Sequence, residues 1–178
     1  MLLGIETAMS RELLILRHGK SDWDGKVAGD FDRPLAKRGR KAVKRMGCWL
    51  CEQKLLPDRI LSSPALRAEQ TALGLCRKAG LSEELIFWRE AIYQADVGTL
   101  LKVLAESDPG ATRVMIVGHN PGCEELVVHL TGQLIPVEPQ APALPTAALA
   151  HLAMPDDWAR LERGCARLLT LVRPRELE

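Results

Sequence analysis

Residues 12–24, ELLILRHGKSDWD, change within a few positions from a buried strand to a polar loop. Residues 13–16 are four apolar residues without alternation, which is typical of a strand covered on both faces. The run ends on Arg17, His18 and Gly19 instead of on an ordinary turn residue. Arginine binds oxyanions through a planar set of donors, and a neutral imidazole is a nucleophile near pH 7. We therefore expect this strand to end at an anion-binding site.

Strands and helices alternate along the rest of the chain. Helices are expected at 34–54, where Val43, Met46 and Leu50 form one apolar stripe, and at 64–79, where Ser63 is the N-cap and Pro64 the first residue. Further helices are expected at 97–107 and 121–130, and further strands at 57–63, 84–88, 113–117, 146–154 and 166–172. This order predicts the α/β class, as a three-layer α/β/α sandwich with a largely parallel central sheet.

Composition limits the classes of protein to consider. The 178 residues are 47% hydrophobic and 26% charged, which suits a single domain over 11–178 preceded by an N-terminal extension over 1–10. A net charge of +1 gives no support to a nucleic-acid or membrane partner. No apolar run approaches the roughly 20 residues of a membrane span. Five scattered cysteines favour a reducing, cytoplasmic compartment, and the CxxC formed by Cys48 and Cys51 lacks a second ligand pair for a metal.

Three strand ends carry residues suited to phosphate chemistry. Arg17 and His18 end the first strand, Arg67 lies in the first turn of the helix that follows the second, and His119 follows the strand at 113–117. In open α/β sheets, ligands bind where the carboxyl ends of strands meet helix N-termini, which themselves favour anions. We therefore predict one phosphate site that contains a potential nucleophile.

Simpler interpretations exist for each of these residues. A single histidine at a strand end is often a polar edge residue, and an arginine in a first helical turn is often solvated. The repetition of strand-end positions favours a common site. His129, late on a helix, and His151, within a strand, lack this context and are interpreted as structural. GKS at residues 19–21 is not a P-loop, because that motif needs a glycine where Leu14 stands.

Four segments resemble one family. LRHGKSDWD (16–24), DRPLAKRGRKA (32–42), LSSPALRAEQT (61–71) and VGHNPG (117–122) resemble, in order, the motifs of the histidine phosphatase superfamily, also called phosphoglycerate-mutase-like. SPALRAEQT, GHNPGCEEL and PTAALAHL are most similar to its SixA-type phosphohistidine phosphatase branch. The resemblance covers residues 13–172. Ala36 replaces a threonine of the family pattern.

The resemblance implies a role for each matched residue. His18 would be the nucleophile that becomes phosphorylated, Arg17 and Arg67 would bind the phosphoryl oxygens, and His119 would complete the pocket, with Gly19 next to the phosphate. No metal or other cofactor is implied. Phosphoryl transfer depends mainly on positioning and on positive charge around three oxygens, which agrees with these residue types.

Two positions depart from the family pattern. Asp24 stands where many members have an asparagine that holds phosphate, and we expect its carboxylate to face the loop or a basic partner. In many members a glutamate after the third strand protonates the leaving oxygen. Glu90 is the nearest candidate for such a general acid, with a surface carboxylate as the alternative; Asp96 is a weaker candidate.

These features lead to one hypothesis and two alternatives. The hypothesis is a metal-independent phosphatase that forms a phosphohistidine intermediate and acts on phosphohistidine in proteins, because that leaving group needs no strong acid and the short chain lacks insertions that would roof a small pocket. One alternative is a phosphomonoesterase for a small phosphorylated metabolite. The other is a non-catalytic phosphate-binding module. A mutase role is less expected, because the sequence shows no extra basic segment that would bind a second acidic group of the substrate.

Overall fold

One six-stranded sheet organises the protein. In the computed structural model, the structure describes residues 10–137, 139 and 141–177. The strand order is β3-β2-β4-β1-β5-β6, with neighbours β3, β2, β4 and β1 parallel and β5 antiparallel to both β1 and β6. The strands are β1 (Arg11–Arg17), β2 (Arg59–Ser62), β3 (Ile86–Trp88), β4 (Arg113–Gly118), β5 (Leu149–Met154) and β6 (Arg167–Val172). The prediction of a largely parallel sheet is confirmed.

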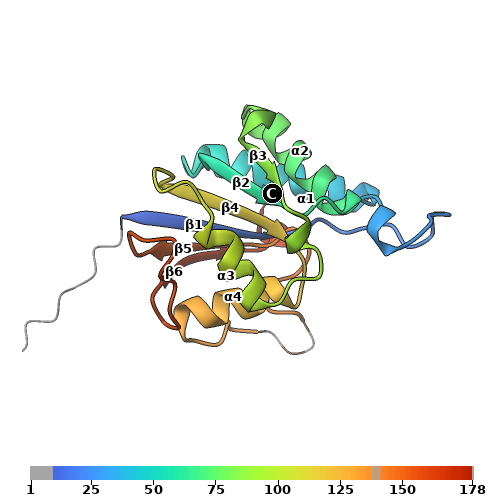
Figure 1. The fold of residues 1–178 in the computed structure, drawn as a ribbon. Coiled ribbons are helices and arrows are strands. Elements are labelled where there is room, and N and C mark those ends of the chain that lie inside the picture. The colour runs from blue at the N-terminus through green and yellow to red at the C-terminus, as the bar shows by residue number, and fades with distance from the viewer. Residues whose placement is uncertain (1–9, 138, 140, 178) are drawn as a thin grey trace, which may run out of the picture.

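Helices cover both faces of the sheet (Figure 1). The helices α1 (Lys37–Glu52) and α2 (Leu66–Ala79) lie on one face, and α3 (Val97–Ala105) and α4 (Gly122–Thr131) lie on the other. Short 3-10 turns η1 (Asp30–Asp32), η2 (Glu83–Leu85), η3 (Glu90–Ile92) and η4 (Pro174–Glu176) lie between or after them. The three-layer α/β/α sandwich is therefore confirmed. In the described part of the chain, no helix is long and apolar enough to cross a membrane.

The central strand shows why its apolar run does not alternate. Leu13 and Ile15 pack in the core under α3 and α4, whereas Leu14 and Leu16 pack in the core under α1 and α2. Successive side chains of a strand point to opposite faces, so a strand with a helical layer on each side needs apolar residues at every position. The unbroken apolar run of β1 therefore follows from its position at the centre of the sheet, between two layers of helices.

Register brings three strand ends to the same level. Arg17 of β1 lies opposite Gly118 of β4, and Ser62 of β2 lies opposite Val117. The pairing continues one residue beyond each strand, because the His18 N–H donates to the Gly118 oxygen and the Ser63 N–H donates to the Val117 oxygen. The residues that follow β1, β2 and β4 therefore leave the sheet side by side.

The helices α1 and α2 begin two or more residues later than predicted. The helix expected from residue 34 begins at Lys37, because Leu35 pairs with Ser21 and its N–H donates to Oε1 of Gln70. The helix expected from Pro64 begins at Leu66. The Ser63 hydroxyl accepts a hydrogen bond from the Ala65 N–H in the turn before that helix, so Ser63 is not its N-cap. Most of the predicted extension, residues 1–9, lies outside the described residues.

Candidate active site

The level ends of β1, β2 and β4 bring two buried histidines together. The ring centroids of His18 and His119 are 5.1 Å apart, with 54° between the ring planes. Arg67, in the first turn of α2, donates its Nε–H to Nε2 of His18 over 3.3 Å and is also buried. The structure thus places in one cluster three residues that the sequence predicted at three separate strand ends.

Hydrogen bonds of His18 determine which ring nitrogen carries the proton. Nδ1 lies 2.7 Å from the Gly19 carbonyl oxygen, which only accepts, so Nδ1 carries the hydrogen. Nε2 accepts from Arg67, whose guanidinium only donates. The unprotonated ring nitrogen is therefore Nε2, and its lone pair accepts the hydrogen bond from Arg67. An attack on phosphorus would use this lone pair in place of that hydrogen bond.

Burial and nearby charge keep the His18 ring neutral. Burial lowers the pKa of His18 to about 3, although the hydrogen bond to the Gly19 oxygen acts in the opposite direction. Interaction with His119 and the charges of Arg67 and Arg17 also contribute to this lowered pKa. An imidazole with this pKa carries its nucleophilic lone pair throughout the neutral pH range.

His119 is held in the same neutral state. Burial, and then the charge of Arg67, lower its pKa to about 4, while Asp30 acts in the opposite direction. Its Nε2 forms a 2.8 Å hydrogen bond with Oγ of Ser63, the residue that follows β2. Its Nδ1 is buried and has no hydrogen-bond partner among the described residues. A Ser63 hydroxyl that donates to Nε2 leaves the ring proton on Nδ1, where it can be donated to an anion.

Arg17 adds a second guanidinium at the end of β1. Its Nη1 donates to the Leu144 carbonyl over 3.0 Å, whereas its Nε is buried and has no partner in the described part of the chain. Its charge contributes to the lowered pKa of both His18 and His119. Buried donors without partners are rare, and Arg17 Nε and His119 Nδ1 are two of them in one cluster. Both are suited to an anionic ligand.

A carboxylate that the sequence did not reveal, Asp30, also lies in this cluster. Arg67 donates Nη1–H to the Asp30 backbone oxygen over 2.6 Å and Nη2–H to Oδ2 over 2.9 Å. Tyr93 donates its hydroxyl to the same Oδ2 over 2.9 Å and lies edge-on to His119, with ring centroids 5.5 Å apart. Arg33 contacts Oδ1 through Nε and Nη2. Asp30 therefore connects two arginines and one tyrosine around the site.

These donors keep the Asp30 carboxyl group ionised. Partial burial raises the pKa of its carboxyl group, but the hydrogen bonds from Arg33 and Tyr93 and the charge of Arg67 outweigh it and lower the pKa to about 2. An ionised Asp30 cannot donate a proton at neutral pH. Its carboxylate instead fixes the far side of the Arg67 guanidinium and attaches the segment 20–36 to α2.

Arg33 holds that segment together. The Arg33 guanidinium is buried, donates to the Ser21 hydroxyl over 2.5 Å, and lies 3.5 Å from the centroid of the exposed Trp23 ring. Figure 1 shows this segment, in blue, projecting beyond the ends of the strands. No periodic pattern marks Asp30, Arg33 or Tyr93; the only sequence signal was their place in long polar loops.

Close packing explains why residue 19 is glycine. Its N–H donates to Thr71 Oγ1 over 3.0 Å, and a Cβ at this position would lie 3.1 Å from Leu35 and Val43 side-chain atoms. Thr71 in turn donates to the Arg67 carbonyl over 2.6 Å. Gly19 thereby lets α1 approach the segment after β1, and its role next to phosphate stays a prediction.

Within the described residues, the side chains of the other candidate residues form no hydrogen bond or ion pair with the cluster. Glu90 is exposed, and its carboxylate makes no hydrogen bond or ion pair within the described residues; its role as general acid stays a prediction. Asp96 caps α3 by accepting from the Thr99 N–H, and Asp24 is exposed in the loop. His129 and His151, expected to be structural, have hydrogen-bond partners outside the site, the Leu161 oxygen and Glu12 Oε2 respectively.

Known proteins similar in sequence agree on one family. The model described as histidine phosphatase superfamily (branch 1) matches residues 13–90. The phosphohistidine phosphatase SixA of Escherichia coli K12 is 34% identical over 146 residues, which are 80% of this chain and 85% of SixA. An uncharacterized protein of Mycobacterium tuberculosis is 32% identical over 166 residues, which are 90% of this chain and 100% of that protein.

Solved structures give the same result. A crystal structure of the putative phosphohistidine phosphatase SixA from Agrobacterium tumefaciens has a TM-score of 0.77 at 28% identity, covering 94% of this chain and 100% of that one. A protein histidine phosphatase SixA complexed with tungstate has the same TM-score and identity, covering 94% and 99%. A mycobacterial glucosyl-3-phosphoglycerate phosphatase, with a TM-score of 0.61 at 18% identity over 90% and 97%, shares the fold.

The tautomer of His18 can be tested by nitrogen NMR. In phosphate-free buffer we expect its side-chain signals to show a neutral ring, protonated at Nδ1 and unprotonated at Nε2, without change as the pH falls from neutral to about 5. The His18 signals are identified because they are absent from the spectrum of the His18→Gln variant. A titration midpoint near the ordinary value of about 6.5, or a proton on Nε2, would contradict the arrangement described.

The charge of Asp30 predicts a pH-dependent contribution to stability. Because its folded pKa of about 2 lies below the ordinary 3.8, this contribution is present above the ordinary pKa and is lost as pH falls through the folded pKa. We expect Asp30→Asn to lower the free energy of unfolding by about 1 kcal/mol at pH 7, with a difference that shrinks below about pH 4.

Asp32→Asn is the matched control for this measurement, since Asp32 lies in the same turn and its carboxylate makes no ion pair in the described part of the chain. Denaturant unfolding of the three proteins across this pH range measures the effect. Equal stability of the Asp30 and Asp32 variants at pH 7 would show that the Asp30 network does not stabilise the fold.

Proposed function

The chain belongs to the histidine phosphatase superfamily, and we propose that it is a metal-independent phosphatase that hydrolyses phosphohistidine in proteins through a phosphorylated His18. The observation that carries the proposal is the His18 ring, which is neutral, with its Nε2 lone pair beside the Arg67 guanidinium. The similarity to SixA, a phosphohistidine phosphatase, supports the substrate class.

In the proposed first step, His18 replaces the imidazole of the substrate. Its Nε2 forms a bond to phosphorus while the bond from phosphorus to the substrate ring nitrogen breaks. A substrate ring that carries a proton on its other nitrogen leaves as neutral imidazole and takes only the bonding electron pair. The His18 ring keeps its Nδ1 proton and becomes cationic, and the Gly19 oxygen, which already accepts that proton, stabilises this charge.

In the second step, water takes the phosphoryl group from the enzyme. The oxygen of water forms a bond to phosphorus, and the bond between Nε2 and phosphorus breaks. His18 is restored as the neutral ring with its proton on Nδ1, and the protons of the water leave with the phosphate as dihydrogen phosphate. The His18 ring is a good leaving group in this step because it departs from phosphorus as a neutral imidazole.

The phosphoryl oxygens would be held by guanidinium and imidazole N–H groups. Arg67 uses one N–H of each of its nitrogens on His18 and Asp30, so each terminal nitrogen keeps one N–H for an oxyanion. The unpartnered Nε of Arg17 and Nδ1 of His119 supply further donors. Fixed positive charge of this kind stabilises a loose phosphoryl transition state.

The protonation state of the site favours a nitrogen leaving group. An alkoxide leaves poorly without a general acid. Asp30, the carboxylate bound to Arg67, is kept ionised with a pKa of about 2, so it cannot serve as that acid near pH 7. Imidazole needs no such group. Phosphohistidine is therefore a better match for this site than an alkyl phosphate ester.

Trapping the intermediate tests the proposal. Brief incubation with a ³²P-labelled phosphohistidine peptide, followed by rapid denaturation and peptide mapping, should give an acid-labile label on His18. We expect His18→Ala to lose the label and to lower kcat/KM by about three orders of magnitude or more. His129→Gln is the matched control, because His129 lies on α4 with a partner outside the site, and it should keep both.

Each contrary outcome corresponds to another function. An alkyl phosphate hydrolysed as well as the peptide, with only the ester activity lost in Glu90→Gln, would indicate a phosphomonoesterase that uses Glu90 as general acid. Binding of phosphate without turnover of either substrate would indicate a non-catalytic module. An acid-stable label, or a label on another residue, would refute His18 as nucleophile.

A further inference from the structure

A dense run of positive charge begins α1, although the chain as a whole is nearly neutral. Six of the nine residues 37–45 are cationic, whereas the whole chain has a net charge of +1. The helix has no acidic residue in its first turn, and its only acidic residue, Glu52, is its last. Since a helix N-terminus is itself electropositive, cations there oppose the helix dipole and make the helix less stable. Their positions therefore call for a role other than the stability of α1.

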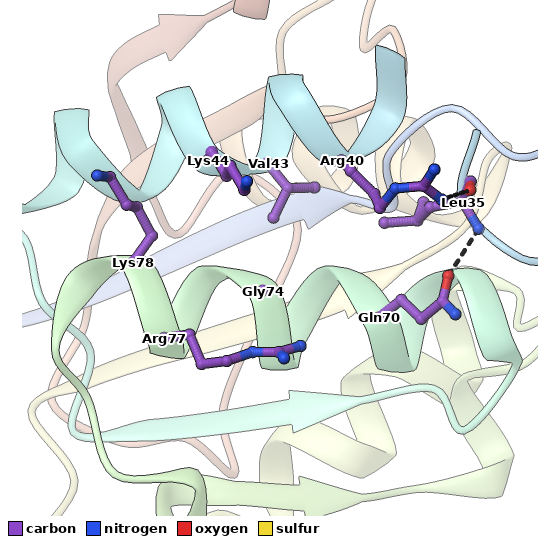
Figure 2. Close-up of a pocket in the computed structure, with 8 residues that line it drawn as sticks. All are labelled: Leu35, Arg40, Val43, Lys44, Gln70, Gly74, Arg77 and Lys78. Carbon is purple, nitrogen blue, oxygen red and sulfur yellow. Dashed lines mark hydrogen bonds between the residues drawn. The ribbon is translucent and has the colours of Figure 1, made fainter. Parts of the chain in front are cut away.

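A groove between α1 and α2 collects part of this charge. Its volume is about 390 Å³, and more of its lining is apolar than polar. Figure 2 shows the cationic side chains on both sides of it, Arg40 and Lys44 from α1 and Arg77 and Lys78 from α2, with Val43 and Leu35 between the helices. Long cationic side chains that line an apolar groove with their aliphatic parts present charge at its rim.

The cations of this groove have no acidic partner within the described residues. Arg40 donates to the Leu35 carbonyl and Arg77 to the Leu73 carbonyl, and neither they nor Lys44 and Lys78 form an ion pair. Four positive charges around one apolar groove repel one another unless an anion lies between them. The electrostatics of the groove thus fit an occupant with negative charges.

One end of the groove lies next to the candidate active site. Gln70 and Leu35 line that end and are joined by a 2.7 Å hydrogen bond, and Arg67 lies one turn before Gln70 on α2. At a rise of about 1.5 Å per residue, Gln70 is about 4.5 Å and Arg77 about 15 Å along the helix from Arg67. The groove is therefore within reach of a protein that has one side chain at His18.

We propose that the groove between α1 and α2 is the docking surface for an acidic segment of the phosphorylated protein substrate. This inference rests on the proposed function for the identity of the partner. Carboxylates of the segment pair with the four cations, and its apolar side chains enter the groove. The lining contains no aromatic residue on which a nucleic-acid base could stack, so an acidic peptide suits it better than RNA.

Peptides that differ only in flanking charge test the proposal. The probes are three phosphohistidine peptides of equal length, flanked by glutamate, glutamine or lysine, with phosphoimidazole as a substrate too small to reach the groove. We expect the wild-type protein to hydrolyse the glutamate peptide with a kcat/KM about tenfold above that of the glutamine peptide, and the preference to decrease as salt increases.

Reversing the charge of the groove tests whether its cations cause the preference for the glutamate peptide. The variant Lys44→Glu/Arg77→Glu/Lys78→Glu should lose the preference for glutamate and favour the lysine peptide, with phosphoimidazole turnover unchanged. The matched control is Lys102→Glu/Arg160→Glu/Arg163→Glu, three exposed cations that lie away from α1 and α2. It makes the same change in net charge and should keep the wild-type preference.

Binding measured without chemistry separates this inference from the proposed function. Fluorescence anisotropy of an unphosphorylated glutamate peptide should show binding that the groove variant loses and the control variant keeps. Such binding without hydrolysis of any phosphohistidine would support the groove and refute the proposed function. Hydrolysis with no effect of flanking charge, or equal losses in both triple variants, would overturn the groove. Tighter groove-dependent binding of a single-stranded RNA oligonucleotide would also overturn it.

Discussion

The register of three parallel strands determines the geometry of the whole site. Because Arg17 of β1 lies opposite Gly118 of β4, and β2 ends level with both, His18, Ser63 and His119 leave the sheet as neighbours. A shift of one residue in either pairing would reverse the face on which these side chains lie. The helical layers make such a shift costly, since every residue from 13 to 16 of β1 is buried under one layer or the other. The packing of the core thus fixes the positions of the reactive groups.

Electrostatics then determine the protonation state of both histidines and of Asp30. Burial and the guanidinium groups of Arg17 and Arg67 keep both imidazoles neutral, while Arg33, Tyr93 and Arg67 keep the Asp30 carboxylate ionised. The Gly19 carbonyl determines the tautomer of His18 from the opposite side of the ring. A site of this kind has a nucleophile ready without deprotonation, and fixed cations for the oxyanion that it attacks.

The sequence predicted those parts of the molecule that follow from periodicity and from strand ends. The four parallel strands and the helical layers follow from the apolar runs, and the cluster of His18, Arg67 and His119 follows from residues placed just after three strand ends. Asp30 and Tyr93 could not be predicted, because their positions depend on the path of polar loops whose conformation has no period. The later start of α1 has a similar cause: Leu35 bonds to Ser21 and Gln70, which are distant in sequence.

A crystal structure with bound tungstate is the decisive test of the anion site. We expect the tungsten atom to lie next to Nε2 of His18, with N–H groups of Arg17, Arg67 and His119 at hydrogen-bonding distances of about 3 Å from its oxygens. We also expect Nδ1 of His18 still to contact the Gly19 oxygen. An oxyanion bound elsewhere in the molecule, or beside a His18 ring turned so that Nδ1 faces it, would contradict this arrangement.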